Sequence, residues 1–226
     1  MLIELILMAY LKTLAENGES NTILKNGIKT KQEEVLAMIS HEHKCIFIHI
    51  GKTGGTSIEH FLSPDVKLDS SKAAQGTGNT HFQEKHYSAI QYKNEFESIF
   101  DLYFKFAFVR NPWDLEISLW KWFDLCFKKK KSFKKHLESR QGSMGFARWI
   151  CDSSQTNLVD FIGRFENLQE DFNIVCDKIG IPQQKLPHKN KTNHKHYTEY
   201  YDDETREIVA EKYAKDIEYF GYKFGE

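Results

Sequence analysis

The sequence lacks both a long apolar run and closely spaced cysteines. A membrane-spanning helix needs roughly 20 consecutive apolar residues, and the most apolar stretch, Met1–Leu11, is shorter and contains Glu4. The four cysteines lie far apart along the chain, whereas a disulfide framework or a tetrahedral zinc site shows densely spaced pairs. We therefore expect buried free thiols, no metal site and no helix that spans a membrane.

An excess of one charge is also lacking. The chain has 31 Lys and Arg against 32 Asp and Glu, a net charge of −1, and nucleic-acid-binding domains usually carry a clear cationic surplus. Hydrophobic residues make up 40% of the 226 residues, which is enough for a core and excludes a disordered chain. Charge is uneven locally, since Lys128–Lys135 contains six lysines.

The N-terminal region differs in composition from the rest. Residues 12–30 are polar and contain Asn-Gly pairs, which are typical of a linker. Met1–Leu11 lacks the cationic start and the small-residue cleavage site of a signal peptide. We expect residues 1–38 to form a helix-and-linker extension and residues 39–226 to form one cytoplasmic domain. A peripheral membrane contact through residues 1–11 is the alternative for that segment.

Two short apolar runs predict buried strands. Cys45–Ile50 (CIFIHI) and Leu102–Val109 (LYFKFAFV) are rich in β-branched and aromatic residues. Each runs into a turn containing glycine or proline that opens a helical pattern. Strands that alternate with helices indicate a parallel sheet with helices packed against it.

The second half of the chain is predicted to be mainly helical. Apolar residues recur at spacings of three and four over Phe165–Ile179, and Gly180 follows as a stop. A last helix has an apolar face of Val209, Tyr213, Ile217 and Phe220, a cap at Asp202 or Asp203, and a stop at Gly221. We expect these apolar faces to pack into the core and to have no catalytic or binding role.

A glycine-rich turn follows the first predicted strand. Residues 50–57 read I-G-K-T-G-G-T-S. Paired glycines let successive backbone N–H groups point into one concavity, and the helix start adds positive potential. With the charge of Lys52, the turn predicts a site for a phosphate-like anion. An ATP-binding loop has the lysine after its last glycine, whereas Lys52 precedes Gly54.

A second candidate anion site follows the second strand. Residues 106–113 read F-A-F-V-R-N-P-W, so the strand ends at Arg110 and Pro112 suits the first turn of a helix. Ser118 lies about two turns along that helix. A guanidinium and a hydroxyl can together hold one phosphate at the carboxyl ends of parallel strands, where α/β folds bind ligands. The alternative is a buried Arg110 that pairs with a carboxylate.

Together these motifs resemble the sulfotransferases that use 3′-phosphoadenosine 5′-phosphosulfate (PAPS). The matching segments are K-T-G-G-T-S after a strand, F-V-R-N-P-W-D with a serine eight residues past the arginine, I-G-R-F-E-N-L-Q-E-D-F and L-P-H-K-N-K. The resemblance is to the family-2 type, which is related to the Golgi carbohydrate sulfotransferases. It extends from Ile39 to Phe224.

The resemblance implies roles for particular residues. Lys52 through Ser57 match the 5′-phosphosulfate loop, with Lys52 beside the bridging oxygen of the sulfate, and Arg110 with Ser118 matches the 3′-phosphate grip. The implied donor-binding set is Lys52, Thr53, Gly54, Gly55, Thr56, Ser57, Arg110, Ser118, Asn190 and Lys191. The chain departs from the family pattern at Gly51, where proline is usual, and at Leu115-Glu116, where Arg-Leu is common.

Sulfuryl transfer also needs a base for the acceptor's proton, and histidine suits that task near neutral pH. The segment His86-Tyr-Ser-Ala89 matches an H-x-x-A-like segment of the family. His86 is therefore the expected base, with His81 and Glu84 as alternatives. His49, within the first predicted strand, is expected to have a core or supporting role.

The sequence thus predicts a P-loop-like three-layer α/β fold with a central parallel sheet flanked by helices. It predicts an enzyme that moves a sulfuryl group from PAPS to an acceptor hydroxyl on a carbohydrate, without a metal. Its expected partners are PAPS or 3′,5′-diphosphoadenosine and a glycan, not nucleic acid. Two alternatives stay open: a P-loop-type nucleotide kinase or phosphotransferase, and a non-enzymatic polyanion-binding module that uses Lys128–Lys135.

Overall fold

The computed structural model of the chain describes residues 35, 38–62, 86–127, 131–140, 145–187 and 195–226. All of them belong to one compact unit, Glu34–Glu226. Residues 1–11 and most of the expected extension lie outside the described residues, so the domain boundary after residue 38 and the membrane contact stay predictions. In the described part of the chain, no helix is long and apolar enough to cross a membrane.

A four-stranded sheet with the order β1-β2-β3-β4 organises the described residues. The strands are β1 (Ile39–Ser40), β2 (Cys45–Ile48), β3 (Phe104–Val109) and β4 (Phe161–Arg164). β2, β3 and β4 are parallel, and β1 pairs with β2 in the antiparallel direction. Because the parallel strands end at the same edge, the segments that follow Ile48, Val109 and Arg164 meet there.

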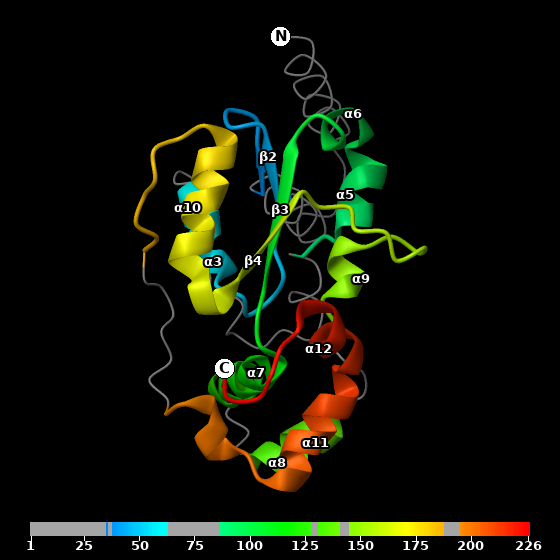
Figure 1. Cartoon of the computed structure of the whole chain (residues 1–226), viewed down its shortest axis with the longest axis vertical. Coiled ribbons are helices and arrows are strands. Elements are labelled where there is room, and N and C mark those ends of the chain that lie inside the picture. Colours follow the sequence, from blue (N-terminus) through cyan, green and yellow to red (C-terminus); the bar gives the residue numbers. More distant parts are fainter. Residues whose placement is uncertain (1–34, 36–37, 63–85, 128–130, 141–144, 188–194) are drawn as a thin grey trace, which may run out of the picture. The chain divides into compact units, whose positions relative to one another are not determined.

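Helices cover both faces of this sheet (Figure 1). α3 (Gly55–Leu62) and α10 (Leu168–Ile179) lie on one face, and α5 (Ala89–Glu95), α6 (Glu97–Phe100) and α9 (Ala147–Ile150) lie on the other. Burial on both faces explains why β2 is apolar throughout. The Phe47 and Phe106 rings stack between neighbouring strands with centroids 5.1 Å apart. The predicted three-layer α/β fold is confirmed.

A group of helices packs beyond the end of β3. It consists of α7 (Pro112–Phe127), α8 (Phe133–Ser139), the 3₁₀ turn η3 (Tyr197–Tyr200), α11 (Asp203–Lys212) and α12 (Ala214–Phe220). The predicted cap is present, since the Asp202 carboxylate accepts the Thr205 N–H at 2.8 Å. Gly221 ends α12 with a left-handed φ of 67°. The single last helix that we predicted is divided in two at Tyr213.

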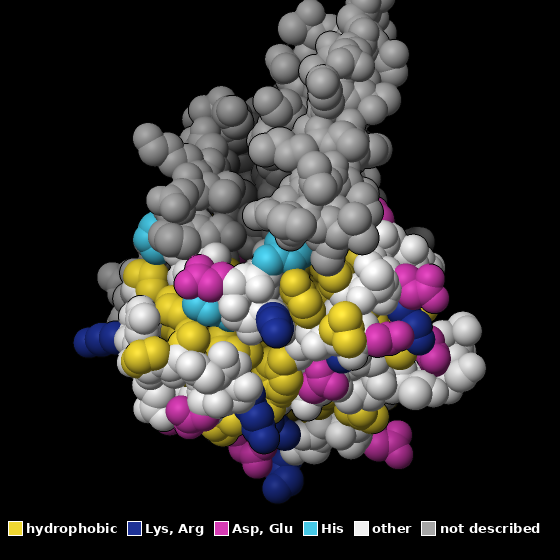
Figure 2. All heavy atoms as spheres, turned by 90° about the horizontal axis from the view of Figure 1, so that it is seen from above, with side chains coloured by type: hydrophobic (Ala, Val, Ile, Leu, Met, Phe, Trp, Pro, Cys, Tyr) yellow, Lys and Arg dark blue, Asp and Glu magenta, His cyan; other side chains and the backbone are white. Residues whose placement is uncertain are grey.

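The cysteines and surface charges follow the expectations from composition. All four cysteines are free; Cys45, Cys151 and Cys176 are buried, and Cys126 is partly buried. On the face in Figure 2, basic and acidic side chains are interspersed, and its described atoms form no continuous cationic surface. Within the lysine-rich segment, Lys134 forms an exposed ion pair of 2.7 Å with Glu204 on α11. Residues 128–130 lie outside the described part.

Candidate active site

The turn between β2 and α3 has two backbone positions in the left-handed region. Lys52 has φ 69° and Gly54 has φ 84°. The Thr53 hydroxyl closes the turn by donating to the Ile50 carbonyl at 2.8 Å. Left-handed backbone is unfavourable for a residue with a side chain, and alternating backbone handedness directs N–H groups toward a common point. The turn therefore has the backbone form of an anion-binding loop.

Both glycines of the turn are also required by packing. A Cβ on Gly54 would lie 2.8 Å from Leu168 Cδ2, at the start of α10. A Cβ on Gly55 would lie 2.1 Å from two ring atoms of His49. No larger residue fits at Gly55 unless the His49 ring moves. The Gly-Gly pair thus brings the loop against the end of β2 on one side and α10 on the other.

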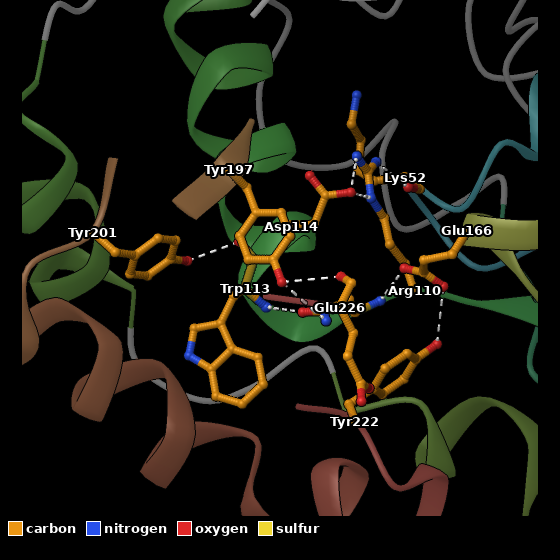
Figure 3. A network of polar contacts seen from close by, with 10 residues as sticks. Lys52, Arg110, Trp113, Asp114, Glu166, Tyr197, Tyr201, Tyr222 and Glu226 are labelled. Carbon is orange, nitrogen blue, oxygen red and sulfur yellow. Dashed lines mark hydrogen bonds and ion pairs between the residues drawn. The ribbon is translucent and has the colours of Figure 1, made fainter. Parts of the chain in front are cut away.

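Arg110 joins the ends of all three parallel strands. It follows β3 and is 6% exposed. Its Nε and Nη2 atoms contact Asp114 Oδ2 at 2.9 and 2.8 Å, and its Nη1 donates to the Lys52 carbonyl at 2.9 Å (Figure 3). Its guanidinium carbon lies 3.9 Å from the ring centroid of Phe165, which follows β4. The carboxylate pairing that we weighed as the alternative is therefore present.

A second carboxylate fixes the residue next to Arg110. Glu166 Oε1 accepts the backbone N–H of Asn111 at 2.6 Å. The Asn111 amide donates to the Lys223 carbonyl at 3.0 Å, and the Tyr197 hydroxyl accepts the Gly225 N–H. Burial raises the pKa of Glu166, and the Asn111 N–H and Arg110 act in the opposite direction. The C-terminal segment thus anchors the turn that presents Arg110.

The side chain of Lys52 is partly buried, so its ammonium group is partly removed from water. Burial, with a smaller contribution from Arg110, lowers the pKa of Lys52 to about 8, while Cys126 acts in the opposite direction. Its Nζ lies 5.9 Å from the centroid of the Trp122 ring on α7. No ion pair holds Lys52 within the described residues. Lys52 and Arg110 are neighbouring cations, and of the two only Arg110 has an ion pair among the described residues, with Asp114; this arrangement favours a bound anion.

The hydroxyl groups of the predicted set are used differently from one another. Thr53 bonds within the turn, and the Ser57 hydroxyl donates to the Pro187 carbonyl at 2.7 Å. Thr56 is partly exposed at the start of α3, and Ser118 is 4% exposed on α7. The Thr53 and Ser57 hydroxyls are therefore already hydrogen-bonded to backbone carbonyls of the protein. Donor binding by these four residues stays a prediction.

His86 lies beside the end of β2 and is 7% exposed. Its Nδ1 contacts the His49 carbonyl at 2.8 Å. Because a carbonyl only accepts, Nδ1 carries the hydrogen, and in the neutral ring Nε2 holds the lone pair. The structure thus brings His86, the loop of Lys52 and Arg110 to the same edge of the sheet.

Other predicted site residues lie outside the described part of the chain. These are His81, Glu84, Asn190 and Lys191. In the described ranges, no group of three or more His, Cys, Asp or Glu side chains could hold a metal ion. The reasoning from sequence did not predict the contacts that Asp114 makes with Arg110 and Glu166 makes with Asn111. Asp114 had a signal, because it lies four residues after Arg110 on a predicted helix; Glu166 had none, because it reaches Asn111 only through the fold.

The fold places a glycine-containing turn after β2 and a buried guanidinium after β3 at one edge of the sheet, an arrangement suited to a phosphate-like anion. Residues 36–223 match the family-2 sulfotransferase model, described as "Sulfotransferase family". The chain belongs to this family.

A protein of Archaeoglobus fulgidus described only as uncharacterized is 31% identical over 99 residues. That match covers 39% of this chain and 77% of the archaeal protein. No solved structure matches the chain. Family membership makes this protein a transferase of sulfuryl groups, and it implies a nucleotide sulfate donor and a hydroxyl acceptor in general terms.

Proposed function

We propose that this protein transfers the sulfuryl group of PAPS to a hydroxyl of a carbohydrate acceptor. The observation that carries the proposal is the contact between the two predicted anion sites. Arg110 donates to the backbone carbonyl of Lys52, so both cations lie at one edge of the sheet. PAPS carries a 5′-phosphosulfate and a 3′-phosphate, so one PAPS molecule could contact both Lys52 and Arg110.

The residues present fit such a donor in charge and in backbone form. The turn at Lys52 and Gly54 offers N–H groups to the 5′ end, and the Lys52 ammonium can neutralise charge on the departing phosphate. Each terminal nitrogen of Arg110 has a second hydrogen beyond its contacts with Asp114 and Lys52, which suits a 3′-phosphate. When bound, PAPS supplies the sulfuryl group.

His86 is the proposed base. Its Nε2 holds the lone pair in the neutral ring and can take the proton of the acceptor hydroxyl. We expect His86→Ala to lower kcat by about 10²- to 10⁴-fold, because that proton then has no acceptor. Nucleotide affinity should stay near that of the unaltered protein. An equal loss of turnover and of nucleotide affinity would remove His86 from this role.

A calorimetric titration with 3′,5′-diphosphoadenosine, and separately with ATP and Mg²⁺, tests the donor site. We expect the diphosphate to bind and Lys52→Ala to weaken it about 10- to 100-fold, because a hydrogen bond to a charged group is lost. Arg110→Ala should also weaken it, and melting temperatures must be compared because Asp114 then loses its partner. Lys178→Ala, an exposed lysine on α10, is the control.

The outcome of that titration separates the alternatives. Tight binding of ATP with Mg²⁺ and none of the diphosphate would favour a kinase. Binding that depends on the lysines of Lys128–Lys135 but not on Lys52 would favour a polyanion-binding module. Transfer of labelled sulfate from PAPS to a panel of glycans and simple phenols then tests the carbohydrate acceptor.

A further inference from the structure

A buried ion pair lies next to Gly55 and His86 of the proposed site. His49 follows β2 and is 6% exposed, and Glu59 on α3 is 1% exposed. His49 Nδ1 and Glu59 Oε1 form an ion pair. A carboxylate at such a depth is costly unless a partner satisfies it, so the pair fixes the orientation of the His49 ring. The His49 ring also stacks on Phe47, with centroids 5.4 Å apart.

His49 contacts both halves of the proposed site. Its ring occupies the space where a side chain at Gly55 would be, with Cδ2 and Nε2 2.1 Å from a Cβ built there. The ring also meets the His86 ring edge-on, with centroids 4.4 Å apart and an interplanar angle of 78°. The His49 carbonyl is the group that contacts His86 Nδ1. One residue therefore supports the donor loop and the base together.

We propose that His49 and Glu59 are positioning residues for the transfer reaction. Glu59 orients the His49 ring, and His49 holds Gly55 of the donor loop and the imidazole of His86 in a fixed arrangement. The inference rests on the proposed function, because it takes His86 as the base. It requires neither residue to touch donor or acceptor. A small misplacement of a base relative to a bound donor is costly to the rate.

Two variants separate the two contacts. Glu59→Gln keeps the shape of the side chain and removes the charge that orients the ring. His49→Asn keeps an amide near the position of Nδ1 and removes the ring from Gly55 and His86. We expect kcat to fall about 10- to 100-fold in each. In Glu59→Gln the affinity for 3′,5′-diphosphoadenosine should be retained. Glu42→Gln, an exposed carboxylate between β1 and β2, is the matched control.

The results distinguish failure of the inference from failure of the proposed function. If the unaltered protein neither binds the diphosphate nor transfers sulfate, the proposed function fails, and the positioning role fails with it. If the unaltered protein is active but both variants keep kcat within about twofold, His49 and Glu59 do not position the base. A fall in kcat with an equal loss of diphosphate binding in Glu59→Gln indicates a purely structural pair and also overturns the inference.

A measurement on the unaltered protein keeps the inference testable if a variant does not fold. Nitrogen-15 NMR of the histidine rings reports which nitrogen carries the hydrogen, and His86→Ala identifies the His86 signals. The contact with the His49 carbonyl requires the neutral His86 ring to carry its hydrogen on Nδ1. A ring with its hydrogen on Nε2 would contradict the arrangement.

Discussion

At the scale of single residues, the charge of Lys52 is the feature most closely tied to the proposed donor. Its backbone is left-handed, with φ 69°. Burial and then Arg110 lower its pKa to about 8. Burial and the charge of Arg110 both disfavour the ammonium form in the free protein. An anion bound in the loop would favour that form and raise the pKa of Lys52 again. Lys52 is thus prepared for a negatively charged ligand.

We predict that binding of 3′,5′-diphosphoadenosine takes up a proton at alkaline pH. Lys52 loses its proton near pH 8 in the free protein, and a bound anion raises that pKa, so binding above pH 8 must reprotonate it. Affinity should fall as pH rises above 8, by up to about tenfold per unit. Titration in buffers of different ionisation enthalpy should give about one proton at pH 9 and nearly none at pH 7.

Two variants check the source of that proton. Lys52→Ala should bind the diphosphate without proton uptake at pH 9, whereas Lys178→Ala should behave like the unaltered protein. The second ionisation of a phosphate lies well below pH 8, so the ligand contributes little at pH 9. Uptake that persists in Lys52→Ala would assign the proton to another group.

Sequence alone could predict the residues of the site that stand in local motifs. Lys52, Gly54 and Gly55 lie in a strand–turn–helix pattern that directs their groups to one point, and Arg110 ends a strand. Their partners could not be predicted in the same way. Glu166 meets Asn111 across 55 positions of the sequence, and such contacts depend on sheet order, which no local pattern specifies.

At the scale of elements, the sequence patterns predicted two parallel strands and the positions of α3, α7, α10 and the α11–α12 region. They did not predict α5, α6, α8 or α9. The predicted strand Cys45–Ile50 ends two residues earlier, at Ile48, because the Thr53 hydroxyl binds the Ile50 carbonyl and turns the chain. β4 had a weak signal because it contains Gly163. Glycine disfavours strands, yet the Phe108 ring occupies the space of a side chain there, with a built Cβ 2.4 Å from Phe108 Cε1.

The break between α11 and α12 is an effect of tertiary structure. Apolar periodicity runs through Tyr213 without interruption, which predicts one helix. In the structure, Tyr213 leaves helical geometry with φ −113° and ψ 20°, and its hydroxyl donates to Glu116 Oε1 at 2.7 Å. A buried acceptor on α7 thus accompanies the change in direction, and only the assembled fold supplies that acceptor.

At the scale of the whole molecule, Glu116 joins the helices beyond the sheet. Its side chain is fully buried on α7, and its carboxylate contacts Arg140 and Lys212, each at 3.0 Å. His136 Nε2 on α8 lies 3.4 Å away. Burial raises the pKa of Glu116, but His136, Arg140, Lys212 and Tyr213 outweigh it and lower the pKa to about 2. Glu116, which belongs to the Leu115-Glu116 departure from the family pattern, therefore has a structural role.

We predict that Glu116→Gln lowers the free energy of unfolding by about 3 to 5 kcal/mol at pH 7, because it leaves buried cations without their carboxylate. The folded pKa of about 2 lies below the ordinary value of 4.5, so the stabilisation is complete above pH 4.5 and is lost as pH falls toward 2. Urea unfolding at pH 7, 4.5 and 3 should show that the difference in unfolding free energy between the variant and the unaltered protein narrows at pH 3.

The control is Glu138→Gln, which alters an exposed carboxylate on α8 and should change stability little at any of these pH values. A gap for Glu116→Gln that stays constant across this range would mean that the loss comes from packing rather than from the charge.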